Sequence, residues 1–107
     1  MSKEFNSATK EIISDIHKKY KLADSINSQI DDYNVEMNLI ERGSIRVTLD
    51  EFRQLKKDLR FAIERHNAIN REINCLGEKL KESDSWFKFS VLCFRDSIEK
   101  YYEEINN

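Results

Sequence analysis

Apolar residues recur at alternating steps of three and four in two long stretches of the chain, a spacing typical of helices that pair in a coiled coil. Only Lys19 interrupts the first series, and only His66 interrupts the second. The predicted seam of the first helix is Ile12, Ile16, Lys19, Ala23, Ile26, Ile30, Tyr33, Met37 and Ile40. The predicted seam of the second is Phe52, Leu55, Leu59, Ala62, His66, Ile69, Ile73, Leu76 and Leu80. We therefore predict helices over about 7–42 and about 49–82.

The segment between the two stretches carries the signals of a short turn. Gly43 suits the left-handed conformation that follows the end of a helix. Thr48 and Glu51 predict a capping box at the start of the second helix, with Val47 and Phe52 as its hydrophobic staple. Because the turn is short, the helices should be antiparallel, and their seams should meet layer by layer in a coiled-coil hairpin.

A shorter, aromatic third helix is predicted over about 85–105. Its apolar positions also alternate by four and three, and they are Phe87, Val91, Phe94, Ile98, Tyr101 and Ile105. We expect this helix to fold back on the base of the hairpin and complete one all-α domain over residues 1–107. Its expected contacts are Ile13, Tyr20, Phe61, Ala68 and the end of the second helix. Cys75 and Cys93 would then lie at one level as small apolar residues in an interface.

The start of the third helix is apolar on more sides than one hairpin can cover, which indicates a binding partner. We expect another protein, a second copy of the chain in a homodimer, or both. The candidate partner-binding residues are Trp86, Phe87, Phe89, Leu92, Phe94, Tyr101 and Tyr102. In the alternative interpretation, long side chains of the same bundle cover the additional apolar faces of this helix.

Two further functions stay open as alternatives. A nucleic-acid-binding hairpin dimer would use basic residues near the turn, namely Arg46, Arg53, Lys56, Lys57 and Arg60. A purely structural coiled-coil subunit would need no other partner. The net charge of −2 gives no general reason to expect nucleic acid or an anionic membrane.

Composition narrows the class of protein. The 107 residues include no proline, two glycines and two cysteines, which excludes a disulfide scaffold and disfavours a turn-rich β-sandwich. The N-terminal segment is polar, and no apolar stretch approaches the roughly 20 residues of a membrane-spanning helix. We therefore expect a cytoplasmic protein that does not bind membranes.

The sequence carries no recognisable enzymatic motif. The two glycines are isolated, so there is no phosphate-binding loop. Neither histidine follows a glutamate by three residues, as di-iron bundles require, because Ser14 precedes His17 and Ile63 precedes His66. We expect His17 on the surface, His66 as a satisfied core residue, and no cofactor or metal. The favoured function is a non-enzymatic protein–protein interaction module of the adaptor, small-chaperone, assembly-factor or inhibitor type.

Overall fold

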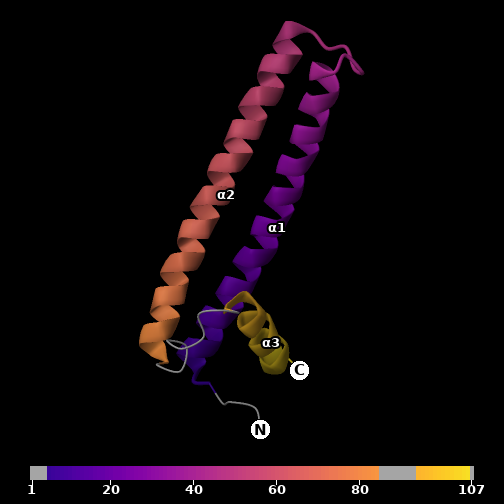
Figure 1. Cartoon of the computed structure of the whole chain (residues 1–107). Coiled ribbons are helices and arrows are strands. Elements are labelled where there is room, and N and C mark those ends of the chain that lie inside the picture. Colours follow the sequence, from indigo (N-terminus) through magenta and orange to yellow (C-terminus); the bar gives the residue numbers. More distant parts are fainter. Residues whose placement is uncertain (1–4, 85–93, 107) are drawn as a thin grey trace. The chain divides into compact units, whose positions relative to one another are not determined.

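The computed structural model describes residues 5–84 and 94–106, and within them every regular element is an α-helix (Figure 1). The helices are α1 (Ser7–Glu41), α2 (Leu49–Ser83) and α3 (Phe94–Asn106). The two long helices pack against each other and α3 packs on α1, which confirms the predicted all-α hairpin with a third helix folded back on it. Residues 85–93 of the predicted third helix lie outside the described residues.

Two compact units make up the chain. The terminal unit consists of Met1–Lys21 and Arg71–Asn107, and the turn unit is Leu22–Asn70. Each long helix contributes a segment to each unit, so each unit contains its own part of the seam. The terminal unit also contains α3, whereas the turn unit consists of two helical segments and their connection.

The seam forms where the spacing predicts it, since every predicted seam residue is buried or half-buried. The buried members are Ile16, Ala23, Ile26, Leu55, Ala62, Ile69, Ile73 and Leu80. The two polar members reach partners at the edge of the seam. Lys19 Nζ donates to Glu72 Oε2 at 3.0 Å. His66, expected in the core, is only half-buried, and its Nδ1 accepts from Asn70 Nδ2 at 3.3 Å.

The turn between α1 and α2 shows the backbone pattern expected from Gly43. This residue has a φ of 78°, in the left-handed region. Its N–H donates to the Ile40 carbonyl at 3.0 Å, and the Ser44 N–H donates to the Leu39 carbonyl at 2.9 Å. These two bonds form a Schellman motif, which satisfies carbonyls that the end of the helix leaves free. At the start of α2, the Glu51 N–H donates to Thr48 Oγ1 at 3.1 Å, which confirms the Thr48 cap.

Gly43→Ala should lower the free energy of unfolding by about 1–2 kcal/mol, because a Cβ is strained in the left-handed region. A Cβ built at Gly43 has no neighbouring atom within 4 Å, so crowding adds nothing to this cost. Gly43→Asn should cost less, since asparagine tolerates this conformation. Chemical denaturation followed by circular dichroism measures both variants. Equal losses for alanine and asparagine would contradict the backbone explanation.

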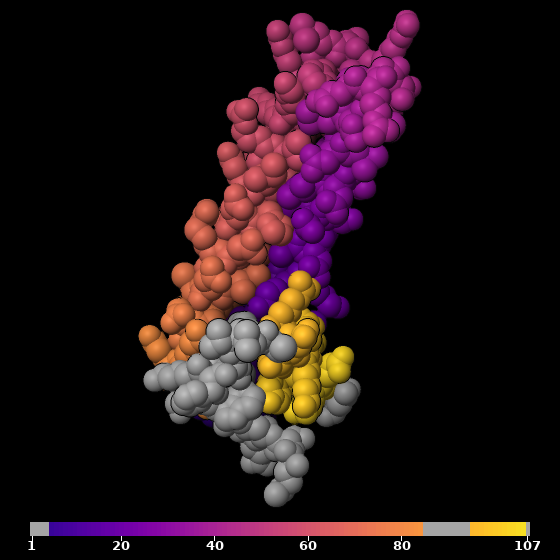
Figure 2. Space-filling model, in the orientation of Figure 1, coloured from indigo at the N-terminus to yellow at the C-terminus, as the bar shows by residue number. Residues whose placement is uncertain are grey.

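The core of the terminal unit lies between three helices. Ile13, Ile16, Leu80 and Ile98 are each 0% exposed. Ile13 lies outside the predicted seam, and it is buried because α3 covers a second face of α1, as predicted. Figure 2 shows the yellow atoms of α3 against the indigo atoms of α1.

The start of α1 is fixed by contacts that the sequence pattern did not reveal. The Thr9 N–H donates to Asn6 Oδ1 at 2.8 Å, so Asn6 caps the helix. The Thr9 hydroxyl lies 2.8 Å from the Ser83 hydroxyl at the end of α2. Phe5 is buried, and its ring meets the Tyr101 ring edge-on, with the centroids 5.0 Å apart. These residues extend the core of the terminal unit beyond the seam.

Two expected contacts are wrong. Phe61, expected beneath the third helix, is 63% exposed, because α3 covers a face of α1 instead. Cys75, expected in an interface, is exposed. It lies on α2 away from the seam positions Ile73 and Leu76, so the paired helix does not cover it. Cys93 lies outside the described residues.

Candidate functional site

The turn unit leaves large apolar side chains on its surface. Among the described residues, all the exposed large hydrophobic ones belong to this unit: Leu22, Val35, Ile45, Leu49, Phe61 and Ile63. A pair of helices buries one stripe of each partner, so apolar residues beside the seam remain in solvent. In the terminal unit α3 covers such residues, and the described large hydrophobic side chains there are buried or half-buried. The two units therefore present chemically different surfaces.

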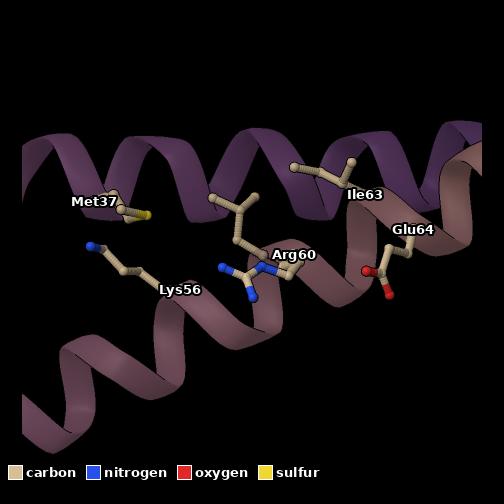
Figure 3. Close-up of a pocket in the computed structure, with 6 residues that line it drawn as sticks. Met37, Lys56, Arg60, Ile63 and Glu64 are labelled. Carbon is tan, nitrogen blue, oxygen red and sulfur yellow. The ribbon is translucent and has the colours of Figure 1, made fainter.

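A hollow of about 520 Å³ opens on one flank of the turn unit. Figure 3 shows Met37 reaching it from α1, while the other labelled residues come from α2. Its apolar lining consists of Met37, Leu59 and Ile63, and Lys56, Arg60 and Glu64 supply charged groups. Ile63 is 41% exposed, so this apolar surface is open to a ligand.

A second hollow, of about 390 Å³, lies beside the turn. It is lined by Ile40, Glu41, Val47, Thr48, Leu49 and Phe52. Val47 and Phe52 are the residues of the predicted staple, and both line this hollow. Leu49, at the start of α2, is 62% exposed there. The local packing that begins α2 thus leaves an apolar recess.

Lys56 of the first hollow lies close to Phe52 of the second. Its Nζ lies 4.8 Å from the centroid of the Phe52 ring, within cation–π range. Phe52 lines the second hollow and Lys56 lines the first. We call the combined surface the α2 groove, and it consists of Leu49, Phe52, Lys56, Leu59, Arg60 and Ile63 on α2 with Met37 and Ile40 on α1.

The basic residues proposed for nucleic-acid binding all belong to the turn unit. Arg46 lies in the connection between α1 and α2, and the others follow on α2. All five (Arg46, Arg53, Lys56, Lys57 and Arg60) are exposed. Within residues 5–84 and 94–106, no ion pair involves any of them. Their positive charge is therefore available to an anionic ligand.

The residues predicted to bind a partner through the third helix are placed only in part. Trp86, Phe87, Phe89 and Leu92 lie outside the described residues. Phe94 is the first residue of α3, and its side chain is also outside them. The other two, Tyr101 and Tyr102, are half-buried and pack on Phe5 and His17 respectively.

His17 lies in the core of the terminal unit, so its predicted surface position is wrong. It is 7% exposed, and its imidazole N–H at Nδ1 donates to Glu99 Oε2 at 2.6 Å. The Tyr102 ring stacks on the imidazole with centroids 3.6 Å apart and planes 11° from parallel. The sequence contains a pattern that could have indicated this burial. A second stripe, beside the seam, consists of Thr9, Ile13, His17 and Tyr20.

Tyr20 completes the contact between α1 and α3. The Arg95 guanidinium lies 4.7 Å from the centroid of its ring. Burial raises the pKa of Tyr20 above 10.0; Arg95 lowers that pKa and Glu99 raises it. The pKa of Tyr101 is also raised, by burial first and then by Glu104.

These shifts predict a loss of stability at alkaline pH. A phenol with a raised folded-state pKa stabilises the fold fully below its unfolded pKa of about 10, and this contribution is lost as pH rises through the folded value. Ultraviolet absorbance of tyrosinate, together with unfolding measured across this pH range, should show both effects. Tyr20→Phe should reduce the alkaline loss of stability. An unchanged loss in that variant would contradict the assignment to Tyr20.

Other kinds of site receive no support from the described residues. No group of three or more histidine, cysteine, aspartate or glutamate residues among them is arranged to hold a metal ion. None of the helices, as far as they are described, is long and apolar enough to cross a membrane. Comparisons of the chain with protein families, curated proteins and solved structures found no match.

Proposed function

We propose that the chain is a non-enzymatic protein–protein interaction module that binds its partner by helix packing. The observation that carries this proposal is the exposure of large apolar side chains throughout the turn unit, with Leu49 at 62% and Phe61 at 63%. Burial of apolar surface contributes about 25 cal/mol per Å², so covering the exposed parts of several such side chains favours association. An adaptor, small chaperone, assembly factor or inhibitor would use such a surface.

The proposal also places the protein in the cytoplasm. The thiol of Cys75 is exposed, and it forms no disulfide with any described residue. Reducing compartments preserve exposed thiols, whereas oxidising ones promote their conversion to disulfides.

Site-specific photocrosslinking in the native host tests the proposed function. A photoreactive amino acid replaces Phe61, and the matched control places it at Asn67, which is exposed on the same helix. We expect a discrete adduct with another protein from position 61 and a weaker or absent adduct from position 67. Equal labelling at both positions, or no protein adduct at position 61, would contradict the proposal.

Nucleic-acid binding is the second candidate, because five exposed cations gather in the turn unit without ion-pair partners among the described residues. Residues 42–60 include six basic and three acidic residues. Binding through these cations would weaken steeply with added salt. Arg53→Gln and Lys57→Gln should each reduce the salt dependence by about one counterion. Retention of nucleic acid that does not vary with salt would exclude this function.

A further inference from the structure

We infer that the α2 groove is the docking site for an amphipathic helix of another protein, with acidic residues at the centre of that helix's binding face. This inference rests on the proposed function and names the chemistry of the partner. It is carried by three features of the groove: the spacing of its residues, its two hollows and the position of its charges.

The groove residues on α2 follow one helical stripe. Leu49, Phe52, Lys56, Leu59 and Ile63 are separated by steps of three, four, three and four. This stripe spans 15 residues, and its two ends lie about 21 Å apart at 1.5 Å per residue. A partner helix of about four turns would match it. Helix-in-groove complexes use anchors at the same spacing along one face of the bound helix.

The two hollows provide places for apolar anchors at separate points of the stripe. Their volumes of about 520 and 390 Å³ lie within the range of about 300–1,000 Å³ that is usual for ligand pockets. Leu49 is exposed in one hollow and Ile63 in the other. Large apolar side chains about three to four turns apart on a partner helix would cover both residues.

The charged residues of the groove determine which charges the partner helix should carry. Lys56 and Arg60 are one helical turn apart, line the larger hollow and take part in no ion pair among the described residues. Carboxylates on the central turn of a partner helix would meet both cations. Glu41 and Glu64 each line one of the hollows, near opposite ends of the groove, and would disfavour acidic residues at the ends of the bound helix.

The same features favour a protein helix over two other occupants. Nucleic acid would use the cations, but its phosphates gain nothing from the apolar lining of Met37, Leu59 and Ile63. A second copy of the groove related by a two-fold axis through its centre would bring Lys56 and Arg60 towards their own copies. Like charges facing one another weaken an interface. An acidic amphipathic helix satisfies both the apolar lining and the cations.

A displayed library of helical peptides tests the inference without knowledge of the natural partner. The peptides have about 16 residues, slightly longer than the stripe, with random anchor and central positions. We expect the full-length protein to enrich large apolar anchors three to four turns apart and aspartate or glutamate at the centre. The charge-swapped variant K56E/R60E should instead enrich lysine or arginine there. Ile63→Ser should weaken binding of the enriched peptides at least about tenfold.

Matched variants separate this inference from the proposed function. Asn67→Ser changes an exposed side chain of α2 outside the groove and should leave peptide affinity unchanged. Circular dichroism establishes that each variant keeps its helices. No enrichment, no change of peptide charge with K56E/R60E, or undiminished binding to Ile63→Ser would each overturn the inference. Photocrosslinking at position 61 tests the proposed function independently. An adduct there would support that function even if the peptide experiment overturned the assignment of the groove.

Two other occupants would give different results. A DNA duplex that binds the protein and is released by K56E/R60E would show that the partner is a polyanion. A dimer in light scattering that Ile63→Ser dissociates would show that a second copy occupies the groove. Either result overturns the assignment to an acidic helix.

Discussion

Ile98→Ala is expected to lower the free energy of unfolding of the terminal unit by about 2–5 kcal/mol. Ile98 is 0% exposed, and among the described side chains of α3 it is the buried apolar one that reaches the core. Alanine removes its apolar contacts and leaves a cavity that the surrounding helices fill only in part. Because α3 has only 13 residues, packing rather than intrinsic helix stability keeps it folded.

Urea denaturation and amide hydrogen exchange together measure this effect. The exchange rates of α3 amides should rise more than those of the turn unit, since the lost contacts are in the terminal unit. Glu103→Ala, at an exposed position of the same helix, is the matched control and should change stability by less than about 0.5 kcal/mol. A loss in Ile98→Ala no larger than in this control would show that α3 does not depend on Ile98.

The hairpin could be predicted from the sequence because its seam has a simple, repeated signal. Spacing placed the end of α1 within one residue of Glu41 and the start of α2 at Leu49. At the turn, Gly43 and Thr48 each have a backbone role that few other residues fill equally well. Local chemistry and long-range packing agree here, and such agreement makes a prediction accurate.

The contact between α1 and α3 was harder to predict, because its central residue on α1 is polar. His17 interrupts the apolar signal of the second stripe, and its partner Glu99 is 82 residues away in the sequence. Spacing alone does not reveal that a distant carboxylate will satisfy a buried imidazole. Phe5 was missed for a related reason, since it is an isolated aromatic residue in a polar segment and Tyr101 lies far along the chain.

The α2 groove was missed because its residues mix two signals. Lys56 and Arg60 belong to the basic group near the turn, whereas Leu59 belongs to the seam. The basic residues were therefore considered for nucleic-acid binding, and Leu59 was considered only for the packing of the two helices. The structure shows that they line one hollow together with Met37 from α1 (Figure 3). These residues come together only when the two helices pair, so neither helix considered alone could have revealed the hollow.

His17→Ala should lower the free energy of unfolding by about 2–3 kcal/mol, because it removes two interactions of a buried side chain. The hydrogen bond to Glu99 contributes about 0.5–1.5 kcal/mol or more, and stacking on Tyr102 about 0.5–1.5 kcal/mol. His17→Phe should lose less, since a phenyl ring keeps the stacking. A double-mutant cycle with Glu99→Ala in urea denaturation should give a coupling energy of about 0.5–3 kcal/mol. Additive losses in the cycle would contradict a direct interaction between His17 and Glu99. His66→Ala in the turn unit is the control, and it should lower the free energy of unfolding by less, because the His66 imidazole is only half-buried.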